Sequence, residues 1–271
     1  MDKLYLENVE IFAYHGVFQE EKTLGQKFII SLELTLDMRE AAITGDLTKS
    51  VHYGELCHKI EEEFKKESYD LIETAVEKIA EYILFNYDMV KCAKVMLKKP
   101  WAPIGRHLDY AAVEIERAWH KCYISIGSNI GDKNRNIEES INRIRNIKEI
   151  RVSKVSTLIE TAPWGIEDQD EFVNGAIEIS TTLSPKELIR TLLKIEAEMK
   201  RERILRWGPR IIDLDVVFYD DLISSDEEII LPHPRMEERI FVLEPLNEIA
   251  PYMLHPIKNK RVFELLSELK G

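Results

Sequence analysis

Hydrophobic and polar residues alternate along four stretches of the first half of the chain, which is the pattern of half-buried strands. The stretches are residues 3–15, 27–38, 91–99 and 110–117. The alternation is clearest in the second stretch, at Ile30, Leu32, Leu34 and Leu36. The sequence therefore predicts four strands within the first 118 residues.

Between the second and third stretches, apolar residues recur with the spacing of amphipathic helices. One stripe comprises Leu56, Ile60 and Phe64, and the next comprises Ile72, Ala75, Val76, Ile79 and Ile83. Asp70 is a candidate N-cap for the second helix, because its carboxylate can accept hydrogen bonds from free N–H groups. The order β-β-α-α-β-β predicts an α+β domain with two helices on one face of an antiparallel sheet. Such an open sheet exposes its edges, so we expect a homo-oligomer formed edge to edge.

A second set of elements follows residues 118–120. Residues 122–126, 151–159 and 211–219 are predicted strands, and residues 133–147 are a predicted helix. Ser184-Pro185-Lys186-Glu187 is a capping box with proline at the first helical position, and an apolar stripe extends that helix to about residue 200. We therefore expect two domains, residues 1–118 and residues 119–271.

The composition is that of a soluble globular protein, with 271 residues, 45% hydrophobic and 32% charged. A net charge of −12 argues against broad binding to nucleic acid or to anionic membranes, which requires a basic surface. No stretch approaches the ~20 apolar residues of a membrane span, and Met1 leads directly into a strand pattern rather than a signal peptide. Three widely spaced cysteines indicate free thiols in a reducing compartment. We expect a cytoplasmic protein.

The densest group of candidate functional residues is the segment 201–215, R-E-R-I-L-R-W-G-P-R-I-I-D-L-D. Guanidinium groups bind phosphate oxygens, and the Gly-Pro pair turns the chain between the arginines and two aspartates. In a strand, Asp213 and Asp215 point to the same face, roughly 6.6 Å apart along the chain. Carboxylates so placed suit Mg²⁺ bound together with substrate phosphates. The alternative is a solvated helix end followed by aspartates that cap a loop.

The first half offers four scattered polar candidates, Glu21, Tyr53, Glu73 and Lys99. Lys99 ends a predicted strand, and the apolar loop Pro100-Trp101-Ala102-Pro103 after it could keep water away from the ammonium, as proton transfer requires. The residues alone also allow a plainer interpretation. In that interpretation Lys99 merely ends a strand, Tyr53 is a half-buried aromatic and Glu21 is solvated.

Residues 160–174 form a long connection rich in turn formers, and long connections in compact domains are often functional. A flat heteroaromatic substrate needs a stacking surface and a polar group at its edge. Trp164 and Phe172 supply the first, and Asn174 supplies the second. The alternative is that Phe172 is a core residue of the strand that follows.

The segment 201–215 resembles the signature of the hydroxymethyldihydropterin pyrophosphokinases of folate biosynthesis. A second motif, L-P-H-P-R-M-E-E-R-I-F at residues 231–241, matches the same family. The resemblance implies a ferredoxin-like α/β domain that binds ATP, a pterin and two Mg²⁺ ions held by Asp213 and Asp215. The implied ATP-binding residues are Glu196, Arg201, Arg203, Trp207, Arg210, His233 and Arg239, with Arg201 and Arg210 as catalytic clamps on the phosphates. The implied pterin-binding residues are Thr161, Pro163, Trp164, Gly165, Phe172, Asn174 and Phe241.

The first domain resembles the dihydroneopterin aldolases. The motifs are Y-H-G-V-F-Q-E-E (14–21), S-V-H-Y-G-E (50–55), D-L-I-E (70–73) and K-P-W-A-P-I (99–104). The resemblance implies a tunnelling-fold-like domain in which Lys99 is the general acid and base, Tyr53 assists proton transfer and Glu21 lies near the side chain that is cleaved. Glu73, with Ile72 beside it, would bind the edge of the pterin. The family uses neither a Schiff base nor a metal for this step. Residues 104–112 depart from its usual pattern, because a proline is missing and Ala112 stands where glycine is common.

Together, the two resemblances imply a bifunctional enzyme. It would cleave 7,8-dihydroneopterin and then transfer a pyrophosphoryl group from ATP to the product, with pterins and ATP as its small-molecule partners. The aldolase resemblance implies a homo-oligomer, a tetramer or an octamer. The alternative is an active pyrophosphokinase fused to a catalytically silent, pterin-binding oligomerisation module.

Overall fold

The structure is a computed structural model of the chain, and it describes all residues except 163–169 and 200–209. Its contacts divide the chain into two compact units, Met1–Trp119 and His120–Gly271. The division falls one residue beyond the boundary placed from the sequence. The expected functional residues Pro163, Trp164, Gly165, Arg201, Arg203 and Trp207 lie outside the described residues.

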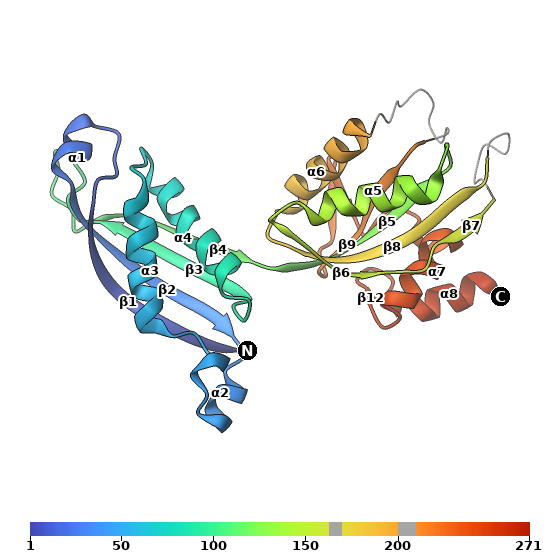
Figure 1. The fold of residues 1–271 in the computed structure, drawn as a ribbon, viewed down its shortest axis with the longest axis horizontal. Helices are drawn as coiled ribbons and strands as arrows, with labels where there is room; N and C mark the ends of the chain where they lie inside the picture. The colour runs from blue at the N-terminus through green and yellow to red at the C-terminus, as the bar shows by residue number, and fades with distance from the viewer. Residues whose placement is uncertain (163–169, 200–209) are drawn as a thin grey trace. The chain divides into compact units, whose positions relative to one another are not determined.

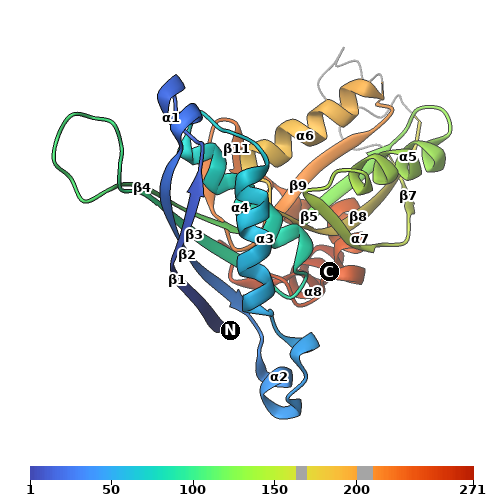
Figure 2. The same cartoon turned by 60° about the vertical axis from the view of Figure 1, so that its left-hand side comes forward.

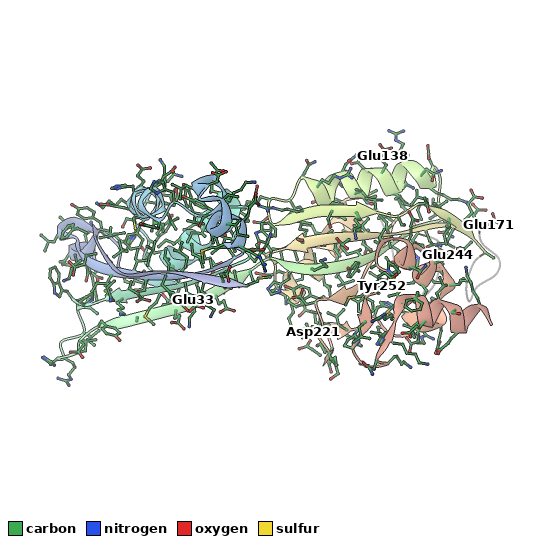
Figure 3. The ribbon with its side chains drawn as sticks, turned by 90° about the horizontal axis from the view of Figure 1, so that it is seen from below. Glu33, Glu138, Glu171, Asp221, Glu244 and Tyr252 are labelled. Atoms are coloured by element: carbon green, nitrogen blue, oxygen red, sulfur yellow. The ribbon has the colours of Figure 1, made fainter. Side chains whose placement is uncertain are left out.

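Unit 1 is built on an antiparallel sheet in the order β1-β2-β3-β4 (Figure 1). Its strands are β1 (Asp2–Ala13), β2 (Gln26–Leu36), β3 (Cys92–Lys99) and β4 (Ala111–Ala118). Alternate residues of β2 are buried from Phe28 to Leu36, whereas Glu33 points away from the core (Figure 3). The four predicted strands and the face that they bury are confirmed.

Helices α3 (Tyr53–Lys66) and α4 (Ile72–Asn86) cover one face of this sheet (Figure 2). Leu56, Ile60 and Phe64 are the buried residues of α3, as the spacing predicted. The prediction that Asp70 caps α4 is wrong. Leu71 occupies the N-cap without a side-chain hydrogen bond, and Asp70 instead forms an ion pair with Lys22 at 2.5 Å.

Short elements lie at the two ends of unit 1. Helix α1 (Gln19–Leu24) lies at one end, and α2 (Arg39–Thr44) lies at the other (Figures 1 and 2). A 3-10 turn, η1 (Leu47–Lys49), connects α2 to α3. The sequence pattern did not predict these elements, because six residues or fewer are too short for a helical stripe.

Unit 2 contains an antiparallel sheet in the order β6-β8-β5-β9. The strands are β5 (His120–Ser128), β6 (Ile150–Val155), β8 (Phe172–Thr181) and β9 (Asp213–Tyr219), with β7 (Ile159–Thr161) paired to β8 beyond β6. The predicted strand 151–159 is therefore interrupted. At the break, the Ser156 hydroxyl accepts a hydrogen bond from the Ala176 N–H, where a backbone carbonyl would continue the ladder.

Helices cover both faces of this sheet. Helices α5 (Lys133–Arg145) and α6 (Pro185–Glu198) pack on one face, and α6 begins with the predicted capping box of Ser184 and Glu187. Turn η2 (Met236–Glu238) and helices α7 (Ile240–Ile249) and α8 (Val262–Lys270) pack on the other. Figure 3 shows the two layers, with Glu138 of α5 on one side of the sheet and Glu244 of α7 on the other. None of the helices in the described part of the chain is long and apolar enough to cross a membrane.

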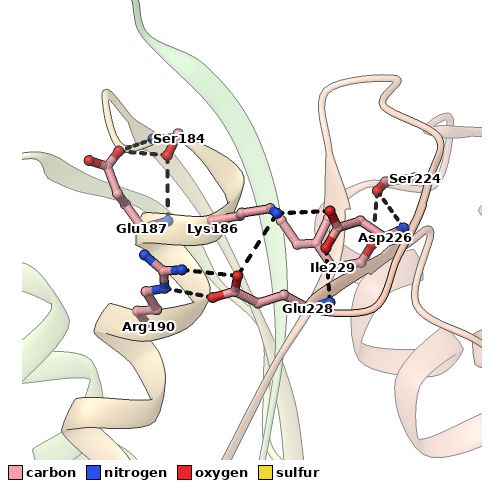
Figure 4. Close-up of polar contacts among 8 residues, drawn as sticks. All are labelled: Ser184, Lys186, Glu187, Arg190, Ser224, Asp226, Glu228 and Ile229. Carbon is pink, nitrogen blue, oxygen red and sulfur yellow. Dashed lines mark hydrogen bonds and ion pairs between the residues drawn. The ribbon is translucent and has the colours of Figure 1, made fainter.

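Two small hairpins complete unit 2, β10 (Ser224–Asp226) with β11 (Ile229–Leu231), and β12 (Leu254–His255) with β13 (Lys260–Arg261). Surface ion pairs join the first hairpin to α6 (Figure 4). Lys186 contacts Asp226 at 2.8 Å, and Arg190 forms two hydrogen bonds with Glu228. Because these side chains are largely exposed, we expect the pairs to orient the hairpin and to contribute little stability.

Candidate active sites

In unit 1, a buried ion pair joins Lys99, the last residue of β3, to Glu21 in α1. Lys99 Nζ lies 2.5 Å from Glu21 Oε1, and each residue is only 8% exposed. The Phe18 N–H and the Gln26 side-chain amide also donate to the Glu21 carboxylate, at 3.1 and 3.0 Å. The structure therefore holds one cation and one anion together out of water.

The surroundings of Glu21 keep it ionised. Burial alone would raise the pKa of the Glu21 carboxyl, but hydrogen bonds from Lys99, Phe18 and Gln26 together lower it below its usual value. Gly16 lies against this carboxylate. A Cβ atom there would approach it to 2.4 Å, and the φ of +152° also disfavours a side chain.

Lys99 is buried as expected, at the end of β3. Trp101 in the loop that follows is 60% exposed, whereas the ring of Phe28 in β2 lies 5.9 Å from Lys99 Nζ. Trp101 therefore contributes little to the burial of Lys99, and a shielding role for the other residues of the loop stays a prediction. The sheet and α1 bury the ammonium, because β3 ends beside the strand that carries Phe28.

Glu73 and Ile72 lie at the start of α4, at the same end of unit 1 as the ion pair. The Gly16 N–H donates to the Tyr69 carbonyl at 2.9 Å, and Asp70 pairs with Lys22 of α1. These contacts fasten the segment before α4 to the segment before Glu21. Glu73 and Leu71 are solvent-exposed, so this end of the unit presents a carboxylate beside apolar surface.

Tyr53 does not lie with these residues. It is the first residue of α3, and it is 62% exposed. Phe64 lies near the other end of α3. The centre of its ring is 4.3 Å from that of His15, which lies at the end of unit 1 that holds the ion pair. Phe64 follows Tyr53 by eleven positions along the helix, roughly 16 Å at 1.5 Å per residue. Within one chain, Tyr53 is therefore at the opposite end of unit 1.

In unit 2, three adjacent strands align the second site. Gly127 of β5 is paired with Asn174 of β8 on one side and with Asp213 of β9 on the other. Residues side by side across a sheet face the same way, so Asn174 and Asp213 share a face, roughly 10 Å apart by two strand spacings. Gly127 leaves the gap between them open, because a Cβ atom there would lie 2.7 Å from the Asn174 Oδ1.

Asp213 and Asp215 point to the same face of β9, as predicted, with buried Leu214 between them on the other face. Arg210 forms an ion pair with Asp213, and His233 Nε2 lies 3.8 Å from Asp215 Oδ2. Within the described ranges, no three His, Cys, Asp or Glu residues form a metal-binding group. The two carboxylates are hard oxygen ligands that suit Mg²⁺, provided that substrate phosphates complete its coordination.

The residues around this carboxylate pair supply cations and aromatic rings. The Arg210 guanidinium lies 5.7 Å from the ring of Phe172, and that of Arg239 lies 5.9 Å from Phe241. Burial and the nearby charge of Arg239 lower the pKa of His233 to about 4, so His233 is neutral at pH 7. Asn174 is buried, and its amide donates to the Thr161 hydroxyl at 2.7 Å.

Glu196 is buried in α6, and its Oε1 accepts a hydrogen bond from the Leu214 N–H at 2.8 Å. This bond holds the strand residue that separates the two aspartates. The expected contact of Glu196 with ATP stays a prediction.

Three buried polar residues near the sites were not predicted from the sequence, namely His15, Gln26 and Asn129. Asn129 exchanges hydrogen bonds with the backbone of Arg210, at 2.8 and 3.1 Å, and donates to the Asp170 carbonyl at 3.2 Å. It therefore joins Arg210 to the start of β8. The sequence could have indicated such residues only by their place inside a short motif, as His15 precedes Gly16. Whether the residue is buried depends on the fold.

Both units match protein-family models. Residues 123–251 match 7,8-dihydro-6-hydroxymethylpterin-pyrophosphokinase, and residues 4–116 match dihydroneopterin aldolase. The chain is 44% identical over 149 residues to a 2-amino-4-hydroxy-6-hydroxymethyldihydropteridine pyrophosphokinase of Methylorubrum extorquens, covering 55% of this chain and 93% of that protein.

Longer relatives match both units. The chain is 31% identical over 283 residues to folic acid synthesis protein FOL1 of Dictyostelium discoideum, covering 94% of this chain. It spans between 36% and 43% of the length of this protein and two fungal folic acid synthesis proteins. A crystal structure of E. coli dihydroneopterin aldolase in complex with neopterin is 25% identical, covering 44% of this chain and all of that one, with a TM-score of 0.41.

Proposed function

Because the chain belongs to the 7,8-dihydro-6-hydroxymethylpterin-pyrophosphokinase family and carries a dihydroneopterin aldolase domain ahead of it, we propose that it catalyses two consecutive steps of folate biosynthesis. Unit 1 cleaves 7,8-dihydroneopterin into 6-hydroxymethyl-7,8-dihydropterin and glycolaldehyde. Unit 2 transfers a pyrophosphoryl group from ATP to that hydroxymethyl group and leaves AMP. The observation that carries the proposal is the buried Lys99–Glu21 pair, which a folding role alone does not require.

The cleavage in unit 1 is a retro-aldol step. A base takes the proton of the substrate's second side-chain hydroxyl, the bond between the first and second side-chain carbons breaks, and glycolaldehyde leaves. The released electron pair forms a double bond between the first side-chain carbon and C6, and the electrons of the C6=N5 bond move onto N5. A proton then adds to the first carbon, and the C6=N5 bond is restored. Because the substrate's own C=N bond accepts the electrons, no lysine imine is needed. Lys99 and Glu21 can move a proton between them over 2.5 Å, which suits both transfers.

Glu73 fits the role of pterin anchor. Its exposed carboxylate can accept two hydrogen bonds from the amino-pyrimidine edge, and Ile72 and Leu71 beside it offer apolar contact. Its place at the end of unit 1 that holds Lys99 supports this assignment.

We also propose that a second copy of the chain completes the aldolase site with its Tyr53. Exposed apolar side chains occur at both ends of unit 1, with Val17, Phe18 and Leu24 at the ion-pair end and Ile43, Leu47 and Tyr53 at the other. Head-to-tail contacts between unlike ends form a closed ring when the rotation between copies closes, and they are an alternative to the edge-to-edge contacts expected from the open sheet. Such a ring, in a tetramer or an octamer, would bring Tyr53 of one copy to Lys99 of the next.

In unit 2, the hydroxymethyl oxygen of the pterin attacks the β-phosphorus of ATP. The bond from that phosphorus to the oxygen of the α-phosphate breaks, AMP departs, and the hydroxyl loses its proton. Arg210 and Arg239 offset the charge of the phosphates, and Asn174 with Phe172 and Phe241 orients the pterin. Asp213 and Asp215 would hold Mg²⁺, two ions on our proposal, which neutralises charge on the transferred group.

If β6 and β7 are counted as one interrupted strand, the elements from β5 to β9 have the order β-α-β-β-α-β, which supports a ferredoxin-like description. In the described structure Cys57, Cys92 and Cys122 are free thiols, which is in keeping with a reducing cytoplasm.

A coupled assay tests the proposed function. The full chain receives dihydroneopterin, ATP and Mg²⁺, and glycolaldehyde and AMP are measured separately. We expect both products. AMP that forms only when hydroxymethyldihydropterin is supplied, without glycolaldehyde, would reduce unit 1 to a pterin-binding oligomerisation module.

A mixing experiment tests the role of the second copy. Lys99→Ala and Tyr53→Phe chains are each expected to cleave dihydroneopterin poorly. After dissociation and reassembly together, some sites would combine intact Lys99 with intact Tyr53, so activity returns. Mixtures no more active than the separate variants would show that the copies do not share a site.

A further inference from the structure

His15 is the most enclosed titratable side chain of unit 1, and the proposed mechanism does not use it. It follows β1 and is 1% exposed. Three aromatic rings surround its imidazole, with ring centroids at 4.3 Å for Phe64, 5.4 Å for Phe28 and 5.5 Å for Tyr69. A polar ring in such a place requires a specific hydrogen-bond partner.

That partner is the backbone before α4. The Tyr69 N–H donates to His15 Nδ1 at 3.1 Å, and the neighbouring Gly16 N–H donates to the Tyr69 carbonyl at 2.9 Å. Residues 15 and 16 therefore bind both backbone groups of Tyr69. We call these two hydrogen bonds the Tyr69 clamp.

His15 acts in this clamp as a neutral ring. Nδ1 accepts a hydrogen bond, so it carries no proton, and the ring proton is on Nε2. Burial, with a smaller contribution from the charge of Lys99, lowers the pKa of His15 to about 4. At pH 7 the imidazole is therefore neutral.

The clamp joins the two parts of the proposed aldolase site. On one side, Gly16 lies directly against the Glu21 carboxylate that holds Lys99. On the other side, Tyr69 precedes Glu73, the proposed pterin anchor, by only four residues. A change at the clamp would therefore alter the separation between the anchor and the proton-transfer pair.

We propose that His15 is a positioning residue for the aldol cleavage, which fixes the distance from Glu73 to the Lys99–Glu21 pair through its hydrogen bond with the Tyr69 N–H. The inference rests on the aldolase function proposed for unit 1. Displacement of reacting groups by about 1 Å can slow a reaction on the order of 100-fold. Loss of the clamp would therefore lower kcat more than it weakens pterin binding.

Two substitutions separate this role from simple packing. His15→Asn keeps an acceptor near the position of Nδ1 but loses much of the ring volume. His15→Phe keeps the ring but leaves the Tyr69 N–H without its acceptor. If His15 positions the site, we expect kcat to fall roughly 10- to 100-fold in His15→Phe and only a few-fold in His15→Asn. If His15 only fills space, the order is reversed.

The measurements use the full chain. Turnover of dihydroneopterin gives kcat and KM, binding of hydroxymethyldihydropterin gives Kd, and exchange of the Tyr69 amide reports on the clamp itself. His255→Asn is the matched control, because His255 is also buried and accepts two backbone N–H bonds through Nδ1, but in unit 2. The control is expected to retain aldolase turnover.

Three outcomes overturn the inference. The first is turnover of His15→Phe as fast as that of His15→Asn, and the second is a loss that lies in KM alone. Loss of a limb of the pH–rate profile in both variants would make His15 a proton-transfer group instead. An inactive wild type, by contrast, would remove the proposed aldolase function and the inference with it.

Discussion

In unit 1, the cation and the anion of the proposed site form an ion pair with each other. Lys99 and Glu21 lie 2.5 Å apart, both are buried, and Glu21 accepts two further hydrogen bonds. In unit 2, the two carboxylates of the proposed site lie on one face of β9. Asp213 is paired with Arg210, while Asp215 is 44% exposed and lies 3.8 Å from a neutral histidine.

The difference is in keeping with the substrate proposed for each site. A proton-transfer site receives a neutral pterin. The positive and negative charges of the site can therefore balance each other before the substrate binds. A pyrophosphoryl-transfer site receives a highly charged triphosphate with its cations. Its own charges must then exchange partners, so the Arg210–Asp213 pair is expected to open when ATP and Mg²⁺ bind.

Asp215→Ala is expected to have the largest effect on unit 2. Loss of one of two carboxylates at the proposed metal site would lower AMP formation by on the order of 10³-fold or more, while glycolaldehyde release stays unchanged. AMP formation would be measured with hydroxymethyldihydropterin supplied directly. Asp221→Ala, which removes an exposed carboxylate just beyond β9 (Figure 3), is the control. Near-normal transfer by Asp215→Ala would contradict the metal assignment.

Lys99→Ala is expected to lower dihydroneopterin cleavage by roughly 10²- to 10⁴-fold, the usual range for loss of an acid–base group. Pyrophosphoryl transfer would continue. Lys98→Ala is the matched control, because Lys98 is the preceding residue of β3 on the opposite face and donates to Asn8. A borohydride-trapped substrate adduct on Lys99 would instead establish an imine mechanism.

Acid is expected to weaken unit 1 through His15. Its folded-state pKa of about 4 lies below the ordinary value of 6.5, so the unfolded chain binds one more proton between these two values. The contribution of neutral His15 to the free energy of unfolding is therefore fully present above pH 6.5. It is lost as the pH falls towards 4, by about 3 kcal/mol in total. Hydrogen exchange of unit 1 amides in the full chain between pH 4 and 7 measures this slope. If the stability of unit 1 falls equally steeply with pH in His15→Asn, the effect belongs to another group.

The smallest effect is expected for Arg190→Ala, which breaks the exposed pair with Glu228 (Figure 4). Surface pairs contribute little, so Tm is expected to change by no more than about 2 °C, with both activities intact. Thermal unfolding and the coupled assay check this. A large loss of pyrophosphoryl transfer would indicate that the β10–β11 hairpin supports the unit 2 site.

Much of the fold follows from local patterns in the sequence. The alternation in β2 and the stripes of α3 and α6 located these elements, because burial of one face imposes a period of about two or 3.6 residues. The capping box at Ser184 was also predicted from a local pattern, because its two partners, Ser184 and Glu187, are three residues apart. Asp70 was misassigned, because its partner Lys22 is distant in sequence.

The residue types of the sites were also present in the sequence, but their grouping was not. The motifs identified Lys99, Glu21, Tyr53 and Glu73 as one set. Only the packed unit shows that three of them gather at one end, while Tyr53 lies at the far end of α3. Helix length and sheet register set such distances, and neither is a property of a short motif.

The sequence by itself determined the chemistry that is available: a lysine and glutamates in one half, arginines with paired aspartates in the other. Tertiary structure alone decided which polar groups lose water. His15, Gln26 and Asn129 have unremarkable neighbours along the chain, yet all three are buried and hydrogen-bonded beside the sites. The reason is physical. A hydrogen bond across 54 residues, as between Tyr69 and His15, forms only when two segments are packed together, and packing depends on the whole unit.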